Sequence, residues 1–346
     1  MRRGLLVFLL ILFLLLGLAI RSVFTLICLL FEDASADAIH RSELPAPNST
    51  LKNPPPQLIP KIIHQTYINS TIPTRWRSAQ QSCLDLHPEY EYMLWTDEKS
   101  HDFITREYPW FLETFENYPY NIQRADAIRY FVLAYHGGVY IDLDDGCKRR
   151  LDPLLAYNAW LRRTVPTGIS NDAMGAIPQH PFFLRVIEHL QNYNRSWFLP
   201  YITIMGSTGP LFLSVMWQKY MQEHLDEGPD WVGRVRVLMP DEYSKRSWSF
   251  FNIFKGDSWH QGDAKLIFWM GDHWMFLTAA GFGLAGIIGL CGYWTYGRIG
   301  LVRTRWKYGP GGHSSPQLTA RRKVRPPLWK RWALKQDYEL VEQHDA

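Results

Sequence analysis

The stretch IQRADAIRYFVLAYHGGVYIDLDDG, residues 122–146, contains the pattern that decides the fold. Its first half predicts a helix, because four residues recur at helical spacing on one stripe. These residues are Ala125, Ile128, Val132 and Tyr135. Asp126 and Arg129, three residues apart, share the adjacent stripe. We therefore expect a helix that buries one face and keeps this charged pair at the margin of that face.

A double glycine ends this helix, and a short strand follows it. Gly137 and Gly138 can adopt the positive φ angles at which helices end. Residues 139–141 are Val, Tyr and Ile, which favour an extended chain. The sequence thus predicts a buried strand that carries Asp142 and Asp144 at its carboxyl end.

The position of these two carboxylates predicts a ligand site. In open α/β sheets, ligands bind in the crevice beyond the carboxyl ends of the strands. Two carboxylates separated by one residue suit a divalent cation, and phosphate oxygens of a ligand would complete its oxygen shell. An isolated Asp-x-Asp is more often a solvated turn. The apolar helix, the glycines and the aromatic strand before Asp142 and Asp144 favour a metal site instead.

Three motifs in this chain resemble those of glycosyltransferase family 32, the DXD sugar transferases. The segment ADAIRYFVLAYHGGVYIDLDDG, residues 125–146, is similar to the family signature. PKIIHQTY at residues 60–67 and LWTD at residues 94–97 resemble two earlier motifs, in the expected order. The resemblance covers residues 58–265. It implies an α/β fold with a single GT-A-type, Rossmann-like glycosyltransferase domain flanked by two transmembrane helices.

The rest of this region agrees with an α/β domain, because short apolar strands alternate with helical runs. The glycine-bearing segments in its second half are expected to be loops that approach a ligand. The expected strands are residues 59–65 and 92–95, the expected helices are residues 75–86 and 182–190, and the expected loops are residues 168–176 and 204–210.

The resemblance also implies roles for charged residues. Asp144 would hold a divalent cation, Mn²⁺ or Mg²⁺, and Asp142 would contact the donor ribose or reach the metal through water. Asp126 and Arg129 match family residues that bind the donor sugar and diphosphate, and the alternative is a structural ion pair. His260 near the end of the domain is the candidate third metal ligand, with a structural histidine as the equal alternative.

Further side chains are expected around the two substrates by the same resemblance. Tyr140 would pack by the nucleotide, and His64 and Gln65 would lie near its base. Asn171 and Asp172 would line the donor sugar, and the alternative is that these two residues only form a turn. The donor side would comprise His64, Gln65, Tyr140, Asn171 and Asp172, and the acceptor side would comprise Thr208 and Gly209.

Two apolar stretches are long enough to cross a bilayer of about 30 Å. The first, residues 4–31, follows a short N-terminus at residues 1–3 and exceeds the apolar region of a cleaved signal peptide. A Pro-rich segment at residues 32–57 predicts a stem that builds no core. The second stretch, residues 274–297, contains no charged residue, and its glycines disfavour a soluble buried helix.

The charges predict an orientation in the membrane. Residues 298–346 contain 11 Lys or Arg against 4 Asp or Glu, whereas residues 32–273 contain 23 against 29. The positive-inside rule then places both termini in the cytosol and the domain in the lumen. The net charge of +4 arises from the basic tail, and the acidic domain argues against nucleic-acid binding.

Other features agree with a lumenal domain. Three N-x-Ser/Thr triplets begin at Asn48, Asn69 and Asn194. Cys83 and Cys147 would face an oxidising compartment, so a disulfide between them is open. The chain contains no G-x-S-x-G elbow and no Walker loop, which leaves hydrolase and nucleotidase functions without support.

With its two predicted spans, this chain resembles a group within family 32 whose members are retaining enzymes. These enzymes transfer mannose from GDP-mannose to inositol phosphorylceramide, a membrane sphingolipid. The resemblance implies a Golgi membrane location and a separate membrane regulatory subunit. One alternative is a Golgi mannosyltransferase that elongates protein-linked glycans, for which one anchor suffices. The other is a non-enzymatic scaffold, which would be expected to lose one of Asp126, Arg129, Asp142 or Asp144. All four are present.

Overall fold

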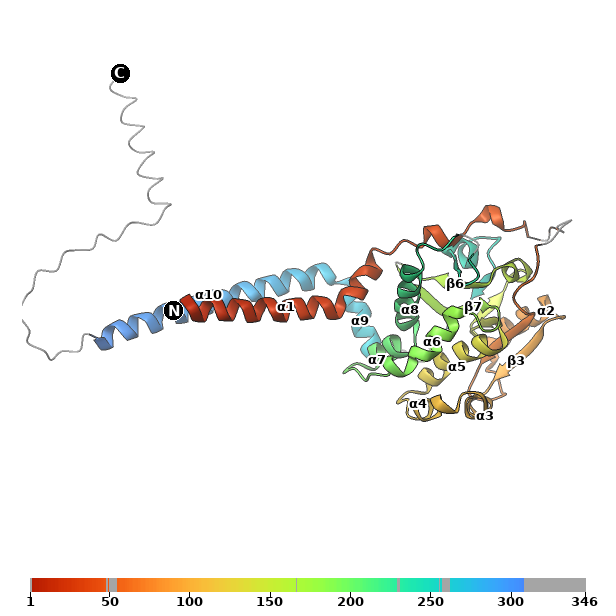
Figure 1. The fold of residues 1–346 in the computed structure, drawn as a ribbon, viewed down its shortest axis with the longest axis horizontal. Helices are drawn as coiled ribbons and strands as arrows, with labels where there is room; N and C mark the ends of the chain where they lie inside the picture. The colour runs from red at the N-terminus through yellow and green to blue at the C-terminus, as the bar shows by residue number, and fades with distance from the viewer. Residues whose placement is uncertain are drawn as a thin grey trace, which may run out of the picture. The chain divides into compact units, whose positions relative to one another are not determined.

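The computed structural model describes residues 2–47, 49, 55–165, 167–228, 231–254, 256 and 262–307. The chain divides into two compact units, Met1–Asp272 and His273–Ala346. The first unit contains helix α1 and a mixed α/β domain, and the second contains helix α10 (Trp274–Lys307) (Figure 1). His260 and Asn48, named above, lie outside the described residues.

Seven strands form the central sheet of the first unit, in the order β1-β8-β6-β7-β4-β2-β3. All neighbours run parallel except β7, which is antiparallel to both β4 and β6. A separate antiparallel pair consists of β5 and β9. The bounds are β1 (Ala38–Ile39), β2 (Ile62–Thr66), β3 (Glu91–Trp95), β4 (Gly138–Ile141), β5 (Asp145–Cys147), β6 (Ala159–Arg163), β7 (Ile169–Ala176), β8 (Val235–Leu238) and β9 (Phe251–Ile253). The expected α/β class is thus confirmed.

The helices of the first unit begin where the sequence offers caps. The Thr96 hydroxyl accepts a hydrogen bond from the Lys99 amide at the start of α3, and Pro181 occupies the first turn of α6. The bounds are α1 (Arg2–Leu30), α2 (Thr74–Leu86), α3 (Asp97–Glu107), α4 (Leu112–Glu116), α5 (Asn121–His136), α6 (Pro181–Tyr193), α7 (Pro200–Ser207), α8 (Pro210–Glu223) and α9 (Gly262–Asp272). The helices expected at residues 75–86 and 182–190 are confirmed as α2 and α6.

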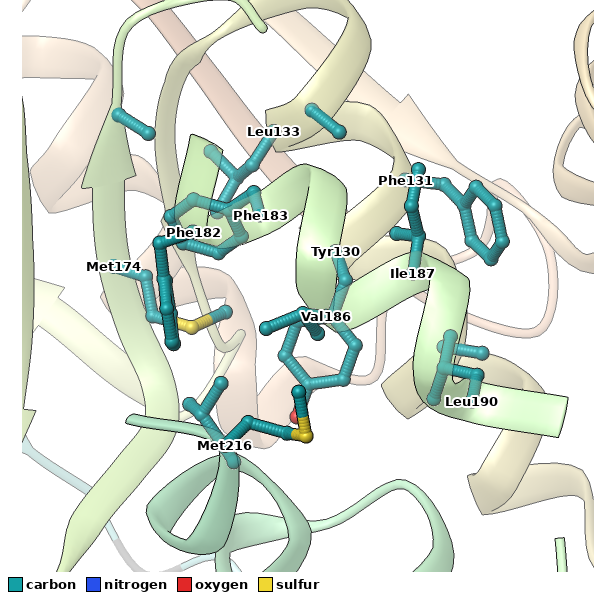
Figure 2. Close-up of a cluster of buried hydrophobic side chains, with 14 of the residues drawn as sticks. Tyr130, Phe131, Leu133, Met174, Phe182, Phe183, Val186, Ile187, Leu190 and Met216 are labelled. Atoms are coloured by element: carbon teal, nitrogen blue, oxygen red, sulfur yellow. The ribbon is translucent and has the colours of Figure 1, made fainter. Parts of the chain in front are cut away.

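The sheet separates two apolar cores. One lies beneath α5, α6 and α8, and Figure 2 shows the aromatic and aliphatic side chains that these helices and β7 contribute to it. The other lies on the opposite face, beside α2 and the β5–β9 pair. Side chains of β4 alternate between the cores, because Tyr140 belongs to the first and Val139 and Ile141 to the second.

The junction between α5 and β4 has the predicted conformation. Gly137 and Gly138 have φ angles of 66° and 91°. A Cβ at either glycine would also lie 2.8 Å from a backbone oxygen of a neighbouring strand, so both positive φ and close approach require glycine here. The expectation of a one-sided helix was wrong. Helix α5 is buried on most sides between the sheet and its neighbours, and Asp126 and Arg129 are buried with it.

Both segments expected to be loops adopt regular structure. Residues 169–176 form strand β7 in the middle of the sheet, although their composition is poor in β-forming residues. The neighbouring strands supply the order, and Gly175 leaves room for the Trp160 indole. Residues 204–207 complete helix α7, and only Thr208 and Gly209 break the chain before α8.

The segment expected to be a stem is part of the domain over residues 32–47. Strand β1 pairs with β8 and extends the sheet. Asp37 pairs with Arg234 at 2.9 Å and Glu43 with Arg236 at 2.8 Å, so the stem is held by ion pairs as well as by strand pairing. Its Pro-rich composition misled the prediction, because two residues of strand suffice when the partner strand is already ordered.

A disulfide joins Cys83 in α2 to Cys147 in β5. It links residues 64 apart in the chain and fixes α2 beside the strand that follows the acidic motif. A cross-link of this loop length is expected to stabilise the fold by about 2–4 kcal/mol.

Of the residues that the structure describes, one stretch is long and apolar enough to cross a membrane. It is Trp274–Gly292 of helix α10. The second predicted span therefore has a matching helix by length and composition. Residues 4–31 fall largely within helix α1, and their role as a first span stays a prediction.

Candidate active site

A cleft of about 940 Å³ opens at the edge of the sheet where β2 and β4 end. Thr66 lies at the end of β2, and Asp142 follows β4 directly. Strand β7 is antiparallel, so its first residues reach the same edge, and Asn171 and Asp172 line the cleft. The Asp142 amide donates a hydrogen bond to the Asp172 carbonyl at 2.7 Å. The acidic motif thus lies at the predicted carboxyl edge of a sheet.

Arg129 connects two carboxylates that lie on different elements. Its guanidinium lies 2.9 Å from an oxygen of Asp126 on α5 and 3.2 Å from an oxygen of Asp142. It also donates to the Asn171 carbonyl at 2.7 Å. Asp126 in turn accepts from the Asn171 amide at 3.1 Å and the Thr208 hydroxyl at 3.3 Å. Five predicted site residues, Asp126, Arg129, Asp142, Asn171 and Thr208, therefore form one network, of which Asp142 alone is partly exposed.

Asp142 is held in a single orientation. The Tyr140 hydroxyl donates to it at 2.6 Å, and Thr66 lies 2.9 Å from the same hydroxyl. Burial raises the pKa of Asp142 to about 7, while Arg129 acts in the opposite direction. Tyr140 itself is fully buried and does not line the cleft. Its hydroxyl is occupied by Asp142, and the nucleotide contact that the resemblance implies stays a prediction.

Asp144 differs from Asp142 in having no cationic partner. Among the described residues, no arginine, lysine or histidine lies within ion-pair distance of its carboxylate. Burial raises its pKa. The backbone of Gly256 approaches so closely that a Cβ at this position would overlap the carboxylate. Asp144 therefore lines the cleft beside Gly256 without a direct ion pair from the described residues, and Arg129 and Arg162 act on its charge only from a longer distance.

A second arginine network lies beside the first and was missed in the sequence. Arg162 of β6 forms an ion pair with Asp145 and lies 3.3 Å from Asp172. Its guanidinium stacks 4.3 Å from the ring centroid of Tyr243. Burial raises the pKa of Asp145 well above its usual range, and Arg162 opposes that shift. The sequence contains only a weak signal for this role, because an arginine within an apolar strand can be assigned a partner only when the neighbouring strands are known.

Two predicted donor residues lie away from the cleft. The His64 ring bridges the Gly137 carbonyl at 2.8 Å and the Trp95 indole at 3.0 Å, and burial lowers its pKa to about 4. Gln65 accepts from the Tyr92 hydroxyl at 2.9 Å and is fully buried. Both side chains are structural here, since β2 directs them into the protein rather than into the cleft.

The residues predicted for the acceptor side lie where α7 meets α8. Thr208 and Gly209 are buried, and the Thr208 carbonyl accepts from the Tyr130 hydroxyl at 2.7 Å. A Cβ on Gly209 would lie 3.1 Å from the Ile204 carbonyl oxygen. The following residue, Pro210, lines the cleft. This segment therefore shapes the cleft wall and positions Asp126.

The other end of the cleft is aromatic. Tyr67 and Trp76 pack edge to face with ring centroids 5.8 Å apart, and Arg75 lies 4.2 Å from the Trp76 ring centroid. Trp95 also lines the cleft. Arg75 and Trp76 were not predicted, because nothing in the sequence connects α2 with the acidic motif. A planar base and an anionic group suit this combination of rings and guanidinium.

The charges at the acidic end fit a divalent cation. Two arginines, Arg129 and Arg162, form ion pairs with four of five neighbouring carboxylates, and Asp144 has none among the described residues, so this end of the cleft is short of positive charge. The five are Asp126, Asp142, Asp144, Asp145 and Asp172. The described residues contain no group of three or more His, Cys, Asp or Glu arranged to hold a metal ion by themselves. A cation here would therefore need oxygen ligands from a bound substrate or from water.

Comparison with known proteins identifies the family. Residues 73–161 match the family described as glycosyltransferase sugar-binding region containing DXD motif. The chain is 54% identical over 273 residues to mannosyl phosphorylinositol ceramide synthase SUR1 of Saccharomyces cerevisiae, covering 79% of this chain and 69% of that protein. It is 52% identical to inositol phosphoceramide mannosyltransferase 2 of Schizosaccharomyces pombe, covering 67% of each.

Among solved structures, a chain named PaToxG glycosyltransferase is 22% identical, with a TM-score of 0.40 over 50% of this chain and 73% of that one. The assignment rests on the sequence relatives alone. Because these relatives are more than half identical to this chain over at least two thirds of its length, the chain is a glycosyltransferase and belongs to the family of the inositol phosphoceramide mannosyltransferases.

Proposed function

We propose that this protein transfers mannose from GDP-mannose to inositol phosphoceramide at a membrane surface, with retention at the anomeric carbon, in a GT-A-type domain. The observation that carries this proposal is the placement of Asp142 and Asp144 in one cleft, beyond the carboxyl end of β4. The relatives in two yeasts support the choice of sugar and acceptor through their names. The aromatic end of the cleft offers a place for the guanine base.

The roles of the charged residues follow from their contacts. Arg129 fixes Asp142 and Asp126 relative to one another, so the donor would meet a preorganised site. Asp126, which faces the cleft from α5, is placed to bind hydroxyl groups of the sugar. Asp142 is held by Tyr140 and Arg129 and is suited to the ribose or to water.

A divalent cation, with Mn²⁺ as the proposed ion and Mg²⁺ as the alternative, fits the uncompensated charge of Asp144. When bound, it would supply Lewis-acid stabilisation of the diphosphate leaving group. Asp144 would hold it directly, because among the described residues no arginine, lysine or histidine lies within ion-pair distance of this carboxylate. The contribution of His260 stays a prediction, since this residue lies outside the described part of the chain.

The proposed location is the Golgi membrane, with the domain in the lumen, two spans and both termini in the cytosol. The disulfide between Cys83 and Cys147 supports an oxidising compartment. The basic segment at residues 298–346 supports a cytosolic tail. A membrane regulatory subunit is part of the proposal by resemblance.

The test is a transfer assay with the full-length protein in nanodiscs. GDP-mannose, Mn²⁺ and inositol phosphoceramide are supplied, with a manno-oligosaccharide as the competing acceptor. We expect mannosylated lipid from the wild type and a loss of at least about 1,000-fold for Asp144→Ala. The control variant is Asp226→Ala, which removes an exposed carboxylate outside the cleft.

The outcomes separate the alternatives. Transfer to the oligosaccharide alone would replace the lipid function with glycan elongation. Full activity of a folded Asp144→Ala protein would remove the metal-site argument. Folding is checked by the thermal midpoint in the same nanodiscs, which should change little because the carboxylate gains no ion pair from the described residues.

A further inference from the structure

An apolar surface surrounds helices α7 and α9. We call it the α7–α9 face and define it by Trp197, Phe198, Ile202, Leu266 and Met270, all of which are exposed. Trp197 is 58% exposed and Phe198 fully exposed. Exposed aromatic and aliphatic groups gathered on adjoining elements are uncommon on soluble surfaces and mark sites of contact.

The two helices that carry this face are fixed to one another. Asp263 of α9 accepts a hydrogen bond from the Tyr201 amide of α7 at 2.7 Å, and the rings of Tyr201 and Phe268 pack at 5.5 Å. Ala264 is fully buried against the domain. Helix α9 therefore rests on α7 through its first turn and directs Leu266 and Met270 outward.

The chain itself indicates what covers this face. Helix α9 ends at Asp272, and α10, the described helix that is apolar enough to cross a membrane, begins at Trp274. Two Cα steps span at most about 7–8 Å. The end of α9 must then lie at the depth where the chain enters the bilayer. Trp, Phe and Met there suit the membrane interface, where aromatic side chains gather.

The charges near the face fit an anionic lipid surface. Arg195 and Lys265 beside this face are exposed, as is Asp272 at the end of α9, and Asp263 accepts the hydrogen bond from α7. Basic residues beside apolar ones favour lipid surfaces that carry phosphate groups.

We propose that the α7–α9 face lies on the lipid surface, with Trp197 and Phe198 inserted among the headgroups. Resting on the function proposed above, the face also sets the distance from the bilayer to the cleft. Helix α7 runs from the face to Thr208, which contacts Asp126 in the cleft. The eight residues of helix α7 span about 12 Å, so one short helix separates this face from the wall of the cleft.

The first test measures contact with lipid and does not depend on catalysis. Phe198→Cys is labelled with the fluorophore NBD in full-length protein in nanodiscs, after the free cysteines Cys28 and Cys291 are replaced by serine. Nitroxide groups on the upper acyl chains should quench this label at least twofold. The same label at Trp110→Cys, an exposed aromatic position on another element, should be unaffected.

Equal quenching at positions 110 and 198 would overturn the proposal. So would a label at 198 that is shielded from aqueous iodide yet unquenched by nitroxide lipid, because a protein would then cover the face. A glycan on Asn194 in the cell would also contradict it, because Asn194 is three residues from Trp197 and a glycan would hold this loop away from lipid.

The second test connects the face with the acceptor. The double variant Trp197→Ser, Phe198→Ser should raise the apparent KM for inositol phosphoceramide in nanodiscs about tenfold and leave GDP-mannose hydrolysis unchanged. Trp110→Ser is the matched control. An unchanged KM would overturn the role in lipid access. If the wild type transfers no mannose to lipid, the function proposed above fails, while the quenching result still decides whether the face contacts the bilayer.

Discussion

The two arginine networks at the cleft have the same composition but different origins. Each arginine pairs with one buried and one partly exposed carboxylate. Arg129 pairs with Asp126 and with Asp142, whose side chain is 29% exposed. Arg162 pairs with Asp145 and with Asp172, whose side chain is 31% exposed. Both ion-pair partners of Arg129 come from the single segment α5–β4, and Tyr140 of the same segment donates to Asp142. The Arg162 network joins β6, β7 and β5 with Tyr243.

This difference suggests a division of work. Arg129 orients Asp142, the carboxylate of the motif that has the most hydrogen-bond partners. Arg162 anchors Asp145, the first residue of β5, which pairs with β9 and so fixes the chain that leads to Gly256 above Asp144. We infer that the Arg129 network orients the carboxylate that contacts the substrate. The Arg162 network holds the segment around Gly256, which we call the cover, against Asp144.

The largest effect is expected from Arg129→Met. Removal of one partner of a buried ion pair leaves an uncompensated carboxylate and costs about 3–5 kcal/mol of unfolding free energy. Transfer should fall at least about 1,000-fold, since Asp142 and Asp126 lose their common partner. Arg162→Met should cost similar stability. The measurements are thermal unfolding and mannose transfer from GDP-mannose in the same detergent.

Matched double variants sharpen this comparison. Replacing the buried carboxylate as well should recover stability in both networks, in Arg129→Met, Asp126→Leu and in Arg162→Met, Asp145→Leu. Activity should return to within about tenfold of the wild type only in the second. Equal recovery of activity in both double variants would contradict the proposed division of work.

The next largest effect tests the cover directly. In Gly256→Ala the added Cβ would overlap the Asp144 carboxylate, so one of the two must shift. We expect turnover to fall about 100-fold and the apparent affinity for Mn²⁺ to weaken, with little change in thermal midpoint. Gly228→Ala is the control, because no atom of the described residues lies within 4 Å of a Cβ at that position. Normal Mn²⁺ affinity in Gly256→Ala would show that the cover tolerates displacement.

The sequence was sufficient for the α5–β4 part of the site, because its determinants are local. Helix spacing, two glycines and the following β-branched and aromatic residues occur within one segment, and the structure has the predicted turn and strand there. What failed was the burial of α5. A stripe of apolar residues does not reveal that Asp126 and Arg129 will be covered by β7 and by the chain around Thr208.

The Arg162 network could not be predicted for the opposite reason. Strand β7 has a loop-like sequence and becomes a strand because β4 and β6 flank it, with Gly175 accommodating Trp160. Its register places Asn171 against α5 and Asp172 beside Arg162. The same dependence on partners explains β1, whose pairing with β8 turned a predicted stem into part of the domain.

A smaller effect is expected from Tyr140→Phe, which removes the hydroxyl that donates to Asp142. A hydrogen bond to a carboxylate contributes about 1.5–3 kcal/mol, so we expect kcat to fall about tenfold or more. Because this bond lowers the pKa of Asp142, its loss should also move the acid limb of the pH–rate profile to higher pH. Tyr92→Phe, whose hydroxyl contacts Gln65 outside the cleft, is the control. An unshifted acid limb would argue that Asp142 does not titrate in the working range.

The smallest expected effect is the change in unfolding free energy with pH that arises from His64 of β2. It separates this buried residue from the carboxylates of the cleft, whose effect has the opposite sign. Burial lowers the pKa of His64 to about 4 in the folded protein, against 6.5 when the side chain is unperturbed. Above pH 6.5 the ring is neutral in both states. As the pH falls below 6.5, the unfolded chain takes up the proton first, so unfolding free energy is lost until the folded pKa is reached.

Between pH 7 and pH 5 this loss should amount to about 2 kcal/mol. The buried carboxylates of the cleft oppose it, because their raised pKa values make protonation stabilise the folded state as the pH falls. The comparison of wild type with His64→Gln isolates the histidine, since the carboxylates contribute equally to both. The stability difference between the two proteins should shrink by about 2 kcal/mol over this range. A constant difference would mean that His64 is not buried as a neutral ring, and its assignment as a structural residue away from the cleft would then be wrong.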